Sequence, residues 1–185
     1  MFREAMPLDE IVTPITKPET EWVRGRALVK TSPTRDHSRI QTQLASALDE
    51  WSIGRGEVGT EWRFRIAVPG EPRRPLVPDV SFVEFAALRG LSHEDIQLPA
   101  FAPTVAVEVL SRGDLAADVA SKIDVYLRGD SRLVIVVDPH ERTLVAHDVA
   151  SVSAFRTGDV FTHPALPDFR LDLAPFFARA LDLPT

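Results

Sequence analysis

Two carboxylates stand on runs of apolar residues, where an ionised side chain is costly. Glu108 lies inside residues 105–110, a run that otherwise has the composition of a fully buried strand. Asp79 opens a similar run over residues 78–83. A buried charge without a partner costs on the order of several kcal/mol. If these strands are neighbours, both carboxylates converge at one point, where they can bind a hard cation such as Mg²⁺ or transfer protons.

Each carboxylate also has a purely structural interpretation. Asp79 follows Pro78, so its side chain could simply cap a turn. Glu108 could pair with an arginine behind the sheet. For Asp79 both interpretations stay open, whereas the apolar surroundings of Glu108 favour a functional role.

Lys122 is the third candidate, on a helix that we expect over residues 115–128. At about 100° per residue, Lys122 falls on the flank of that helix's apolar stripe. Its aliphatic stem can be buried there while the ammonium group reaches the edge of the sheet. A lysine in that place could hold a scissile phosphate or orient a water molecule. The alternative is an ordinary ion pair with Asp118, one turn earlier in the helix.

The remaining residue types exclude several other chemistries. The five histidines form no metal-binding pair at helical spacing, although His37, in the first turn of an expected helix, could face the sheet end as an accessory residue. There is no Gly-x-Ser-x-Gly elbow, no phosphate-binding glycine loop and no dinucleotide fingerprint. The absence of cysteine excludes disulfides and thiolate sites, and fits a reducing compartment.

The elements that must position these residues follow from hydrophobic periodicity and turn residues. We expect a hairpin over residues 21–30, and helices over residues 36–51, 115–128 and 173–183. Strands are expected over residues 57–68, 78–83, 105–110, 133–137, 143–148 and 160–161, with a mixed helix and loop segment over residues 84–103. The strand–helix–strand order over residues 105–137 requires parallel pairing, and the hairpins require antiparallel pairing. The sequence therefore predicts an α/β domain, with a mixed sheet flanked by helices.

Length and composition bound the domain organisation. With 185 residues, of which 44% are hydrophobic, the chain is long enough for one domain with a real core. We expect a loosely ordered lead-in over residues 1–19 and a single domain over residues 20–185. No apolar run approaches the roughly 20 residues that span a bilayer, and the N-terminus lacks the apolar core of a signal peptide. We therefore expect a cytoplasmic protein with no membrane partner.

The charge distribution bears on nucleic acid as a partner. A net charge of −6 argues against a broad electrostatic grip on a phosphate backbone. Residues 24–39, however, hold five basic residues and one acidic residue. That segment is either a local basic face or an ordinary solvated surface.

Four segments follow one another in a specific order and spacing. They are Pro78-Asp79-Val80-Ser81-Phe82-Val83, Val107-Glu108-Val109-Leu110-Ser111, Asp118-x₃-Lys122-x₃-Tyr126 and Val136-Val137-Asp138-Pro139. Together they resemble the Uma-type family of putative restriction endonucleases, which belongs to the PD-(D/E)XK nuclease superfamily and was formerly labelled a domain of unknown function. Each motif is weak alone, but the resemblance covers about residues 20–177.

The resemblance implies a restriction-endonuclease-like core with an N-terminal β-hairpin extension. It also implies a Mg²⁺ site formed by Asp79 and Glu108, with Mn²⁺ as a possible substitute, and Lys122 completing the catalytic set. The superfamily's usual pattern places this lysine two residues after the glutamate, where this chain has Leu110. Lys122 instead stands 14 residues after Glu108, on the following helix, where this family tends to carry it.

The expected function is that of a metal-dependent endonuclease that hydrolyses phosphodiester bonds of nucleic acid, with DNA as the favoured substrate and a homodimer as a reasonable assembly. Candidate contacts to the nucleic acid backbone are Arg63, Arg65, Arg73 and Arg74. One alternative is a nuclease-like domain that binds nucleic acid or protein without cutting. Another is a hydrolase of small substrates with a carboxylate pair, although nothing in the sequence marks an open sugar cleft.

Overall fold

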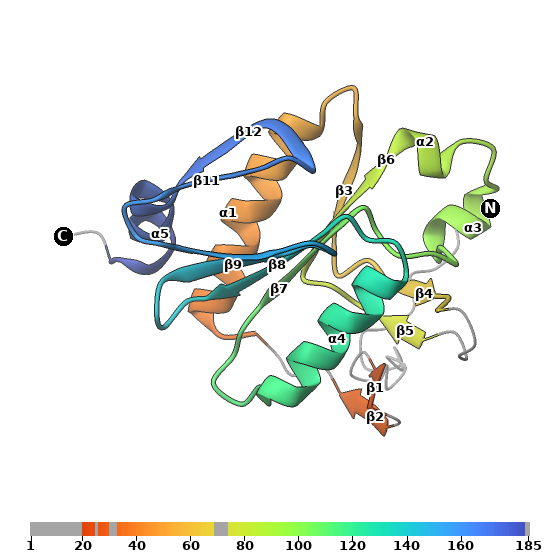
Figure 1. The fold of residues 1–185 in the computed structure, drawn as a ribbon, viewed down its shortest axis with the longest axis horizontal. Helices are drawn as coiled ribbons and strands as arrows, with labels where there is room; N and C mark the ends of the chain where they lie inside the picture. The colour runs from red at the N-terminus through yellow and green to blue at the C-terminus, as the bar shows by residue number, and fades with distance from the viewer. Residues whose placement is uncertain (1–19, 25, 30–32, 69–73, 184–185) are drawn as a thin grey trace, which may run out of the picture.

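The structure, a computed structural model, describes residues 20–24, 26–29, 33–68 and 74–183 (Figure 1). The expectation for residues 1–19 lies outside the described residues. The central element is a six-stranded sheet with the strand order β10-β9-β8-β7-β6-β3. Its strands are β3 (Gly56–Thr60), β6 (Val80–Glu84), β7 (Val105–Val109), β8 (Leu133–Asp138), β9 (Thr143–His147) and β10 (Val152–Arg156). β7 and β8 pair in parallel and the other neighbours are antiparallel, so the predicted mixed sheet is confirmed.

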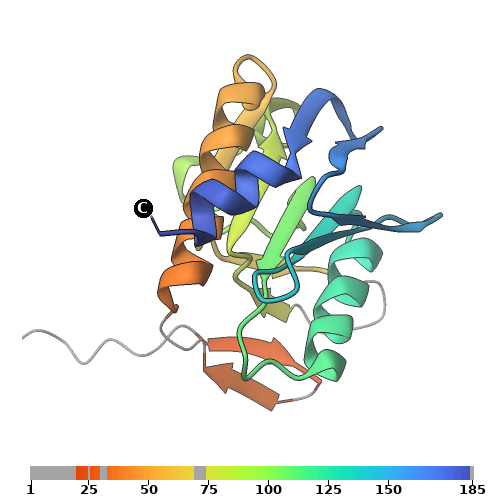
Figure 2. The ribbon, with the colours of Figure 1, turned by 90° about the vertical axis from the view of Figure 1, so that its left-hand side faces the viewer.

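Helices cover both faces of the sheet (Figure 2). On one face lie α1 (Arg35–Ser52) and α5 (Leu173–Leu181), and on the other lies α4 (Ala116–Arg128). β7 is buried on both faces because its residues alternate between two core clusters: Val107 packs with α1 and α5, and Ala106 packs with α4. The strand that carries Glu108 therefore lies in the middle layer of the molecule.

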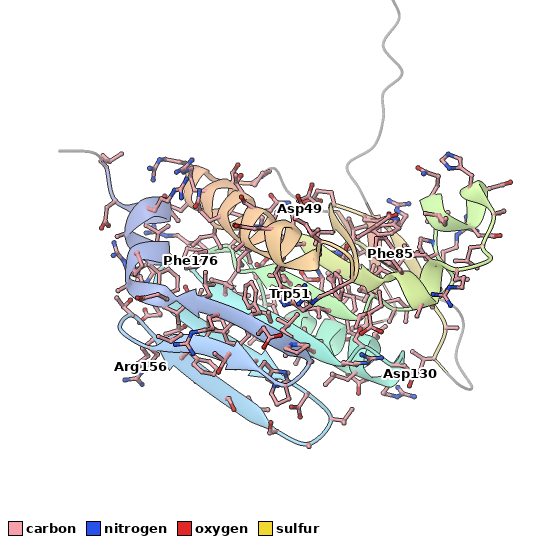
Figure 3. All side chains as sticks on the ribbon, turned by 90° about the horizontal axis from the view of Figure 1, so that it is seen from above. Asp49, Trp51, Phe85, Asp130, Arg156 and Phe176 are labelled. Carbon is pink, nitrogen blue, oxygen red and sulfur yellow. The ribbon has the colours of Figure 1, made fainter. Side chains whose placement is uncertain are left out.

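The first helix begins at a capping threonine. The Thr34 hydroxyl accepts a hydrogen bond from the His37 backbone N–H at 3.4 Å. Ile40, Leu44 and Leu48 are fully buried at helical spacing and fix the face that packs on the sheet. Figure 3 labels Trp51 near the end of this helix, where its ring packs edge-on against Phe82 with centroids 5.0 Å apart.

The crossover from β7 to β8 runs through α4 and ends at Gly129. A Cβ atom at this glycine would lie 2.5 Å from Ile66 Cγ2, so only glycine fits against the neighbouring strand. The backbone N–H of Gly129 also donates to the carbonyl oxygens of the last helical turn. The chain can therefore turn directly into the parallel strand.

The prediction of one strand over residues 57–68 is wrong. The chain leaves β3 at Thr60, turns at Glu61 with a φ of +53°, and resumes as β4 (Phe64–Ile66). β4 pairs with β5 (Arg74–Leu76) in a separate two-stranded sheet. The turn lets Phe64 and Ile66 join the core cluster beneath α4.

Smaller elements complete the fold. β1 (Thr20–Val23) and β2 (Arg26–Val29) form the predicted hairpin, and α2 (Phe85–Leu88) and α3 (His93–Gln97) fall in the segment predicted as mixed. A further hairpin, β11 (Val160–His163) and β12 (Leu166–Asp172), precedes α5. The sequence pattern predicted only the start of this hairpin and missed β5, β10 and β12. Among the described residues, no helix is both long and apolar enough to cross a membrane.

Candidate active site

Asp79 and Glu108 lie at one end of the central sheet: Asp79 directly precedes β6, and Glu108 is on the neighbouring strand β7. β6 and β7 pair antiparallel with Val80 opposite Val107, so Asp79 and Glu108 are the next residues in register. Both carboxylates are buried, with relative exposures of 2% for Asp79 and 6% for Glu108. The expectation that the two strands are neighbours is confirmed.

The Asp79 side chain is held from both sides. Its Oδ2 atom accepts a hydrogen bond from the Val109 backbone N–H at 2.6 Å and lies 3.2 Å from His37 Nε2. Gln41, one turn after His37 on α1, donates from Nε2 to the Asp79 carbonyl oxygen at 2.9 Å. The carboxylate of Asp79 thus bridges to the neighbouring strand, and the first turn of α1 brings His37 to the sheet end.

Glu108 is paired with two side chains of α4. Lys122 Nζ donates to Oε2 at 2.9 Å, and the Tyr126 hydroxyl donates to Oε1 at 2.8 Å. Lys122 and Tyr126 are one helical turn apart, so a single helix holds both oxygens of the carboxylate. The alternative ion pair of Lys122 with Asp118 is not the one found: Lys122 pairs with Glu108, and Asp118 lies 3.7 Å from an Arg24 nitrogen.

Glu21 is a further member of the site, and no sequence motif singles it out. It lies on β1, is 3% exposed, and places Oε2 at 2.6 Å from Lys122 Nζ. Its Oε1 atom accepts the Val77 backbone N–H at 2.9 Å. The sequence does contain a hint of this position. Glu21 and Val23 are two residues apart on one strand, so their side chains lie on the same face, and the apolar Val23 indicates that this face points inward.

Electrostatics fix the protonation states of the α4 groups. Burial lowers the pKa of Lys122, but the negative charges of Glu108 and Glu21 outweigh it and hold this pKa well above its ordinary value of 10.5. Burial, together with the charge of Glu108, raises the pKa of Tyr126 well above 10.0. At neutral pH, Lys122 is therefore a fixed cation and not a general base, and Tyr126 keeps its proton as a donor.

The charge of Asp79 also contributes, as the smallest of the causes, to the raised pKa of Tyr126. The two carboxylates of Asp79 and Glu108 are the donor type that Mg²⁺ prefers. Within the described ranges, no group of three or more acidic or histidine side chains is arranged to hold a metal ion. Mg²⁺ commonly keeps several waters and needs only one or two protein carboxylates, so this pair fits it.

The four arginines proposed for nucleic acid contact fall around β4 and β5. Arg65 is exposed on β4, and Arg63 is half-buried just before that strand. Arg74 begins β5, where only its backbone is described, and Arg73 lies outside the described residues. Their role toward nucleic acid stays a prediction.

The described residues form a mixed sheet flanked by helices, with a buried acid–lysine cluster at one end of the sheet. A crystal structure with this fold is described as a putative nuclease belonging to DUF820 from Anabaena variabilis ATCC 29413. The similarity has a TM-score of 0.79 at 20% sequence identity and covers 91% of this chain and 95% of that one.

The sequence itself gives the family. The Uma2 family, described as putative restriction endonuclease, matches residues 10–174, and this chain belongs to that family. The resemblance found from the sequence motifs is therefore confirmed. A search among curated proteins gave no match.

Proposed function

We propose that this protein is a Mg²⁺-dependent endonuclease that hydrolyses phosphodiester bonds of nucleic acid, with DNA as the substrate. The observation that supports this most strongly is the cluster in which Lys122 stands as a cation against buried Glu108, with Asp79 on the neighbouring strand. Membership of a family of putative restriction endonucleases supports the same reaction class.

Asp79 and Glu108 would hold Mg²⁺, with Mn²⁺ as a possible replacement. When bound, such an ion polarises the phosphate and makes water a stronger nucleophile at neutral pH. His37 and Gln41 hold Asp79 in place, and Tyr126 holds Glu108. The carboxylates are thereby fixed before substrate arrives, which reduces the reorganisation that the reaction requires.

Lys122 has a separate role at the phosphate. An ammonium group has three N–H donors, and Glu21 and Glu108 occupy two of them at 2.6 and 2.9 Å. The third can donate to an oxygen of the scissile phosphate and stabilise the charge that develops there. Glu21 keeps the lysine aimed at this point.

The experiment is a cleavage assay on plasmid DNA, single-stranded DNA and RNA, with Mg²⁺, Mn²⁺ or EDTA. Wild-type protein is compared with Asp79→Asn, and with Glu57→Gln as the control because Glu57 is an exposed acid on β3. We expect metal-dependent cleavage by wild type and the control, and a loss of at least about 100-fold in Asp79→Asn. No cleavage of any substrate by wild type would favour the non-cutting alternative, and undiminished cleavage by Asp79→Asn would remove the proposed mechanism.

A further inference from the structure

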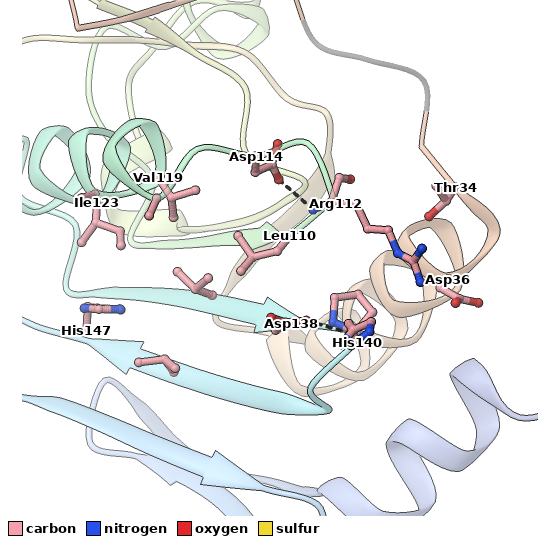
Figure 4. Close-up of a pocket in the computed structure, with 16 residues that line it drawn as sticks. Thr34, Asp36, Leu110, Arg112, Asp114, Val119, Ile123, Asp138, His140 and His147 are labelled. Carbon is pink, nitrogen blue, oxygen red and sulfur yellow. Dashed lines mark hydrogen bonds between the residues drawn. The ribbon is translucent and has the colours of Figure 1, made fainter.

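A pocket of about 800 Å³ opens beside the candidate active site, between α4 and the β8–β9 pair (Figure 4). This volume lies in the range that ligand sites in proteins use. None of its lining residues belongs to the acid–lysine cluster, and the proposed reaction gives the pocket no role.

The walls of the pocket are two apolar surfaces that face each other. One wall is formed by the α4 side chains Val119, Ala120 and Ile123. The other is formed by Val136 and Val145 on the sheet and by Leu110 directly after β7. Figure 4 shows Val119 and Ile123 on α4 above the strands, and Leu110 at the start of the loop that follows β7. A slot between two apolar surfaces suits a flat ring whose faces are otherwise exposed to water.

The pocket is continuous with the site through the strand register. Glu108 is paired with Val136 on β8, and Val136 is paired with Val145 on β9, so the three residues form one row across the sheet. Neighbouring strands lie about 4.8 Å apart, so the pocket floor begins one strand away from the catalytic carboxylate. At its other end the pocket reaches Asp36, which directly precedes His37.

The charges around the pocket favour a neutral base over a phosphate. Asp36, Asp114 and Asp138 line the pocket with Arg112 and the histidines His140 and His147, so carboxylates outnumber guanidinium groups in its lining and disfavour an anion. Asp114 and Asp138 each use one oxygen within their own turn, and Asp36 uses one in an ion pair with Arg35 at 2.9 Å, which leaves a second carboxylate oxygen on each to accept a hydrogen bond. Such acceptors suit the amino groups on the edges of nucleobases.

We propose that this pocket binds one unpaired nucleobase of the substrate strand, next to the scissile phosphate. The inference rests on the proposed nuclease function and narrows its substrate to nucleic acid that is single-stranded or locally unpaired at the cut. A paired base has its edge and both faces covered, so it must leave the duplex to enter a slot of this kind. The phosphate stays outside, at Lys122.

The test uses two alanines of the same exposed helix surface. Ala120 lines the pocket and Ala117 does not, so Ala120→Trp fills the pocket while Ala117→Trp is a matched control. Binding of a fluorescent 12-nucleotide single strand and of the corresponding duplex is measured in EDTA, where no cleavage occurs. We expect Ala120→Trp to weaken single-strand binding about tenfold or more, as loss of one stacked base would, with duplex binding unchanged. Ala117→Trp should change neither.

A second variant and a second probe test whether weaker binding by Ala120→Trp comes from filling the pocket and not from another effect of the tryptophan. Val145→Phe fills the pocket from the sheet side and should weaken binding in the same way. A strand that carries reduced abasic sites should bind wild type as weakly as the intact strand binds Ala120→Trp, and the variant should not distinguish the two strands. Equal single-strand affinities for the two tryptophan variants would overturn the assignment.

The outcomes separate this inference from the proposed function. If wild type cleaves nucleic acid but filling the pocket changes nothing, only the pocket assignment fails. If binding depends on the pocket but no cleavage is found, the nuclease proposal fails and the pocket remains a base-binding site. If wild type binds and cleaves no nucleic acid, both fail.

Discussion

At the scale of single residues, Lys122 decides the charge balance of the site. Its ammonium group lies within 2.9 Å of carboxylate oxygens from both Glu21 and Glu108, and its side chain is only 13% exposed. Without this cation, two buried carboxylates would face each other with no counter-charge from α4. The acids and the lysine therefore depend on each other for stability as well as for chemistry.

We predict that Lys122→Met destabilises the fold by about 3–5 kcal/mol at pH 7, because removing one member of a buried ion cluster leaves uncompensated charge. The loss should shrink as the pH is lowered, since unpaired buried carboxylates have raised pKa values and take up protons in the folded state. Urea denaturation between pH 5 and pH 8 measures this. The control is Arg128→Met, on the exposed side of the same helix, which should be nearly neutral. A loss that is the same at every pH would contradict the charge argument.

The raised pKa values of Lys122 and Tyr126 give a second prediction, at alkaline pH. A group whose pKa is higher in the folded state contributes stability that is complete below its ordinary pKa and is lost at higher pH. The ordinary values are 10.5 for Lys122 and 10.0 for Tyr126, so unfolding free energy should be insensitive to these groups near pH 8 and should fall above about pH 10. Denaturation curves from pH 8 to pH 11 should show a shallower fall in Tyr126→Phe. An unchanged slope in that variant would remove Tyr126 from the explanation.

At the scale of elements, the site combines a glutamate from β7 with a lysine from α4. Leu110 stands two residues after Glu108, so it leaves β7 on the same side of the sheet. This is the position where the sequence resemblance places the usual lysine of the superfamily. Both positions can therefore direct a long cationic side chain toward the same carboxylate.

This equivalence predicts a rescue. Lys122→Leu should lower the cleavage rate at least about 100-fold, and adding Leu110→Lys to that variant should restore about tenfold. Single-turnover cleavage rates measure both changes. Leu110→Lys alone, in the wild-type background, controls for a general effect of added charge. A double variant no faster than Lys122→Leu would mean that the two elements do not reach the same point.

The order of the elements could be predicted from the sequence because hydrophobic periodicity marks buried faces. The prediction of strands from this periodicity failed where neither face of a strand is buried. It also failed where apolar and polar residues keep alternating through a turn of the backbone. β10 is almost entirely exposed and so carries no apolar pattern. At Glu61 the alternation of side chains persists, although the backbone turns with a φ of +53°. Neither feature is encoded in the pattern that locates strands.

At the scale of the whole molecule, the site draws on β1, the start of β6, β7, α1 and α4. Asp79, Glu108 and Lys122 could be found in advance because each breaks an apolar pattern or matches a family motif. The contact between Glu21 and Lys122 could not, because it joins residues a hundred positions apart through a hairpin whose place in space depends on the finished fold. The local sequence can therefore identify a charged residue within an apolar run, but it cannot identify the distant residue with which that charge forms an ion pair.

The net charge of −6 leads to a prediction about binding. An acidic protein that binds nucleic acid only near its active site should neutralise few phosphates. If about two phosphates are contacted by basic side chains, the affinity for single-stranded DNA should fall only about tenfold between 50 and 200 mM salt. Fluorescence anisotropy across this range gives the slope directly. A much steeper slope would reveal a broad basic surface that the charge distribution does not suggest.

The central claim is that Glu108 is a catalytic carboxylate and not only a structural partner of Lys122. Glu108→Gln tests it most directly, because the amide keeps a hydrogen bond to Tyr126 while Glu21 continues to pair with Lys122. The decisive measurement is the Mg²⁺-dependent cleavage rate of this variant, recorded with its unfolding free energy. We predict stability within about 2 kcal/mol of wild type and a cleavage rate at least about 100-fold lower. A folded variant that cleaves at the wild-type rate would contradict the account.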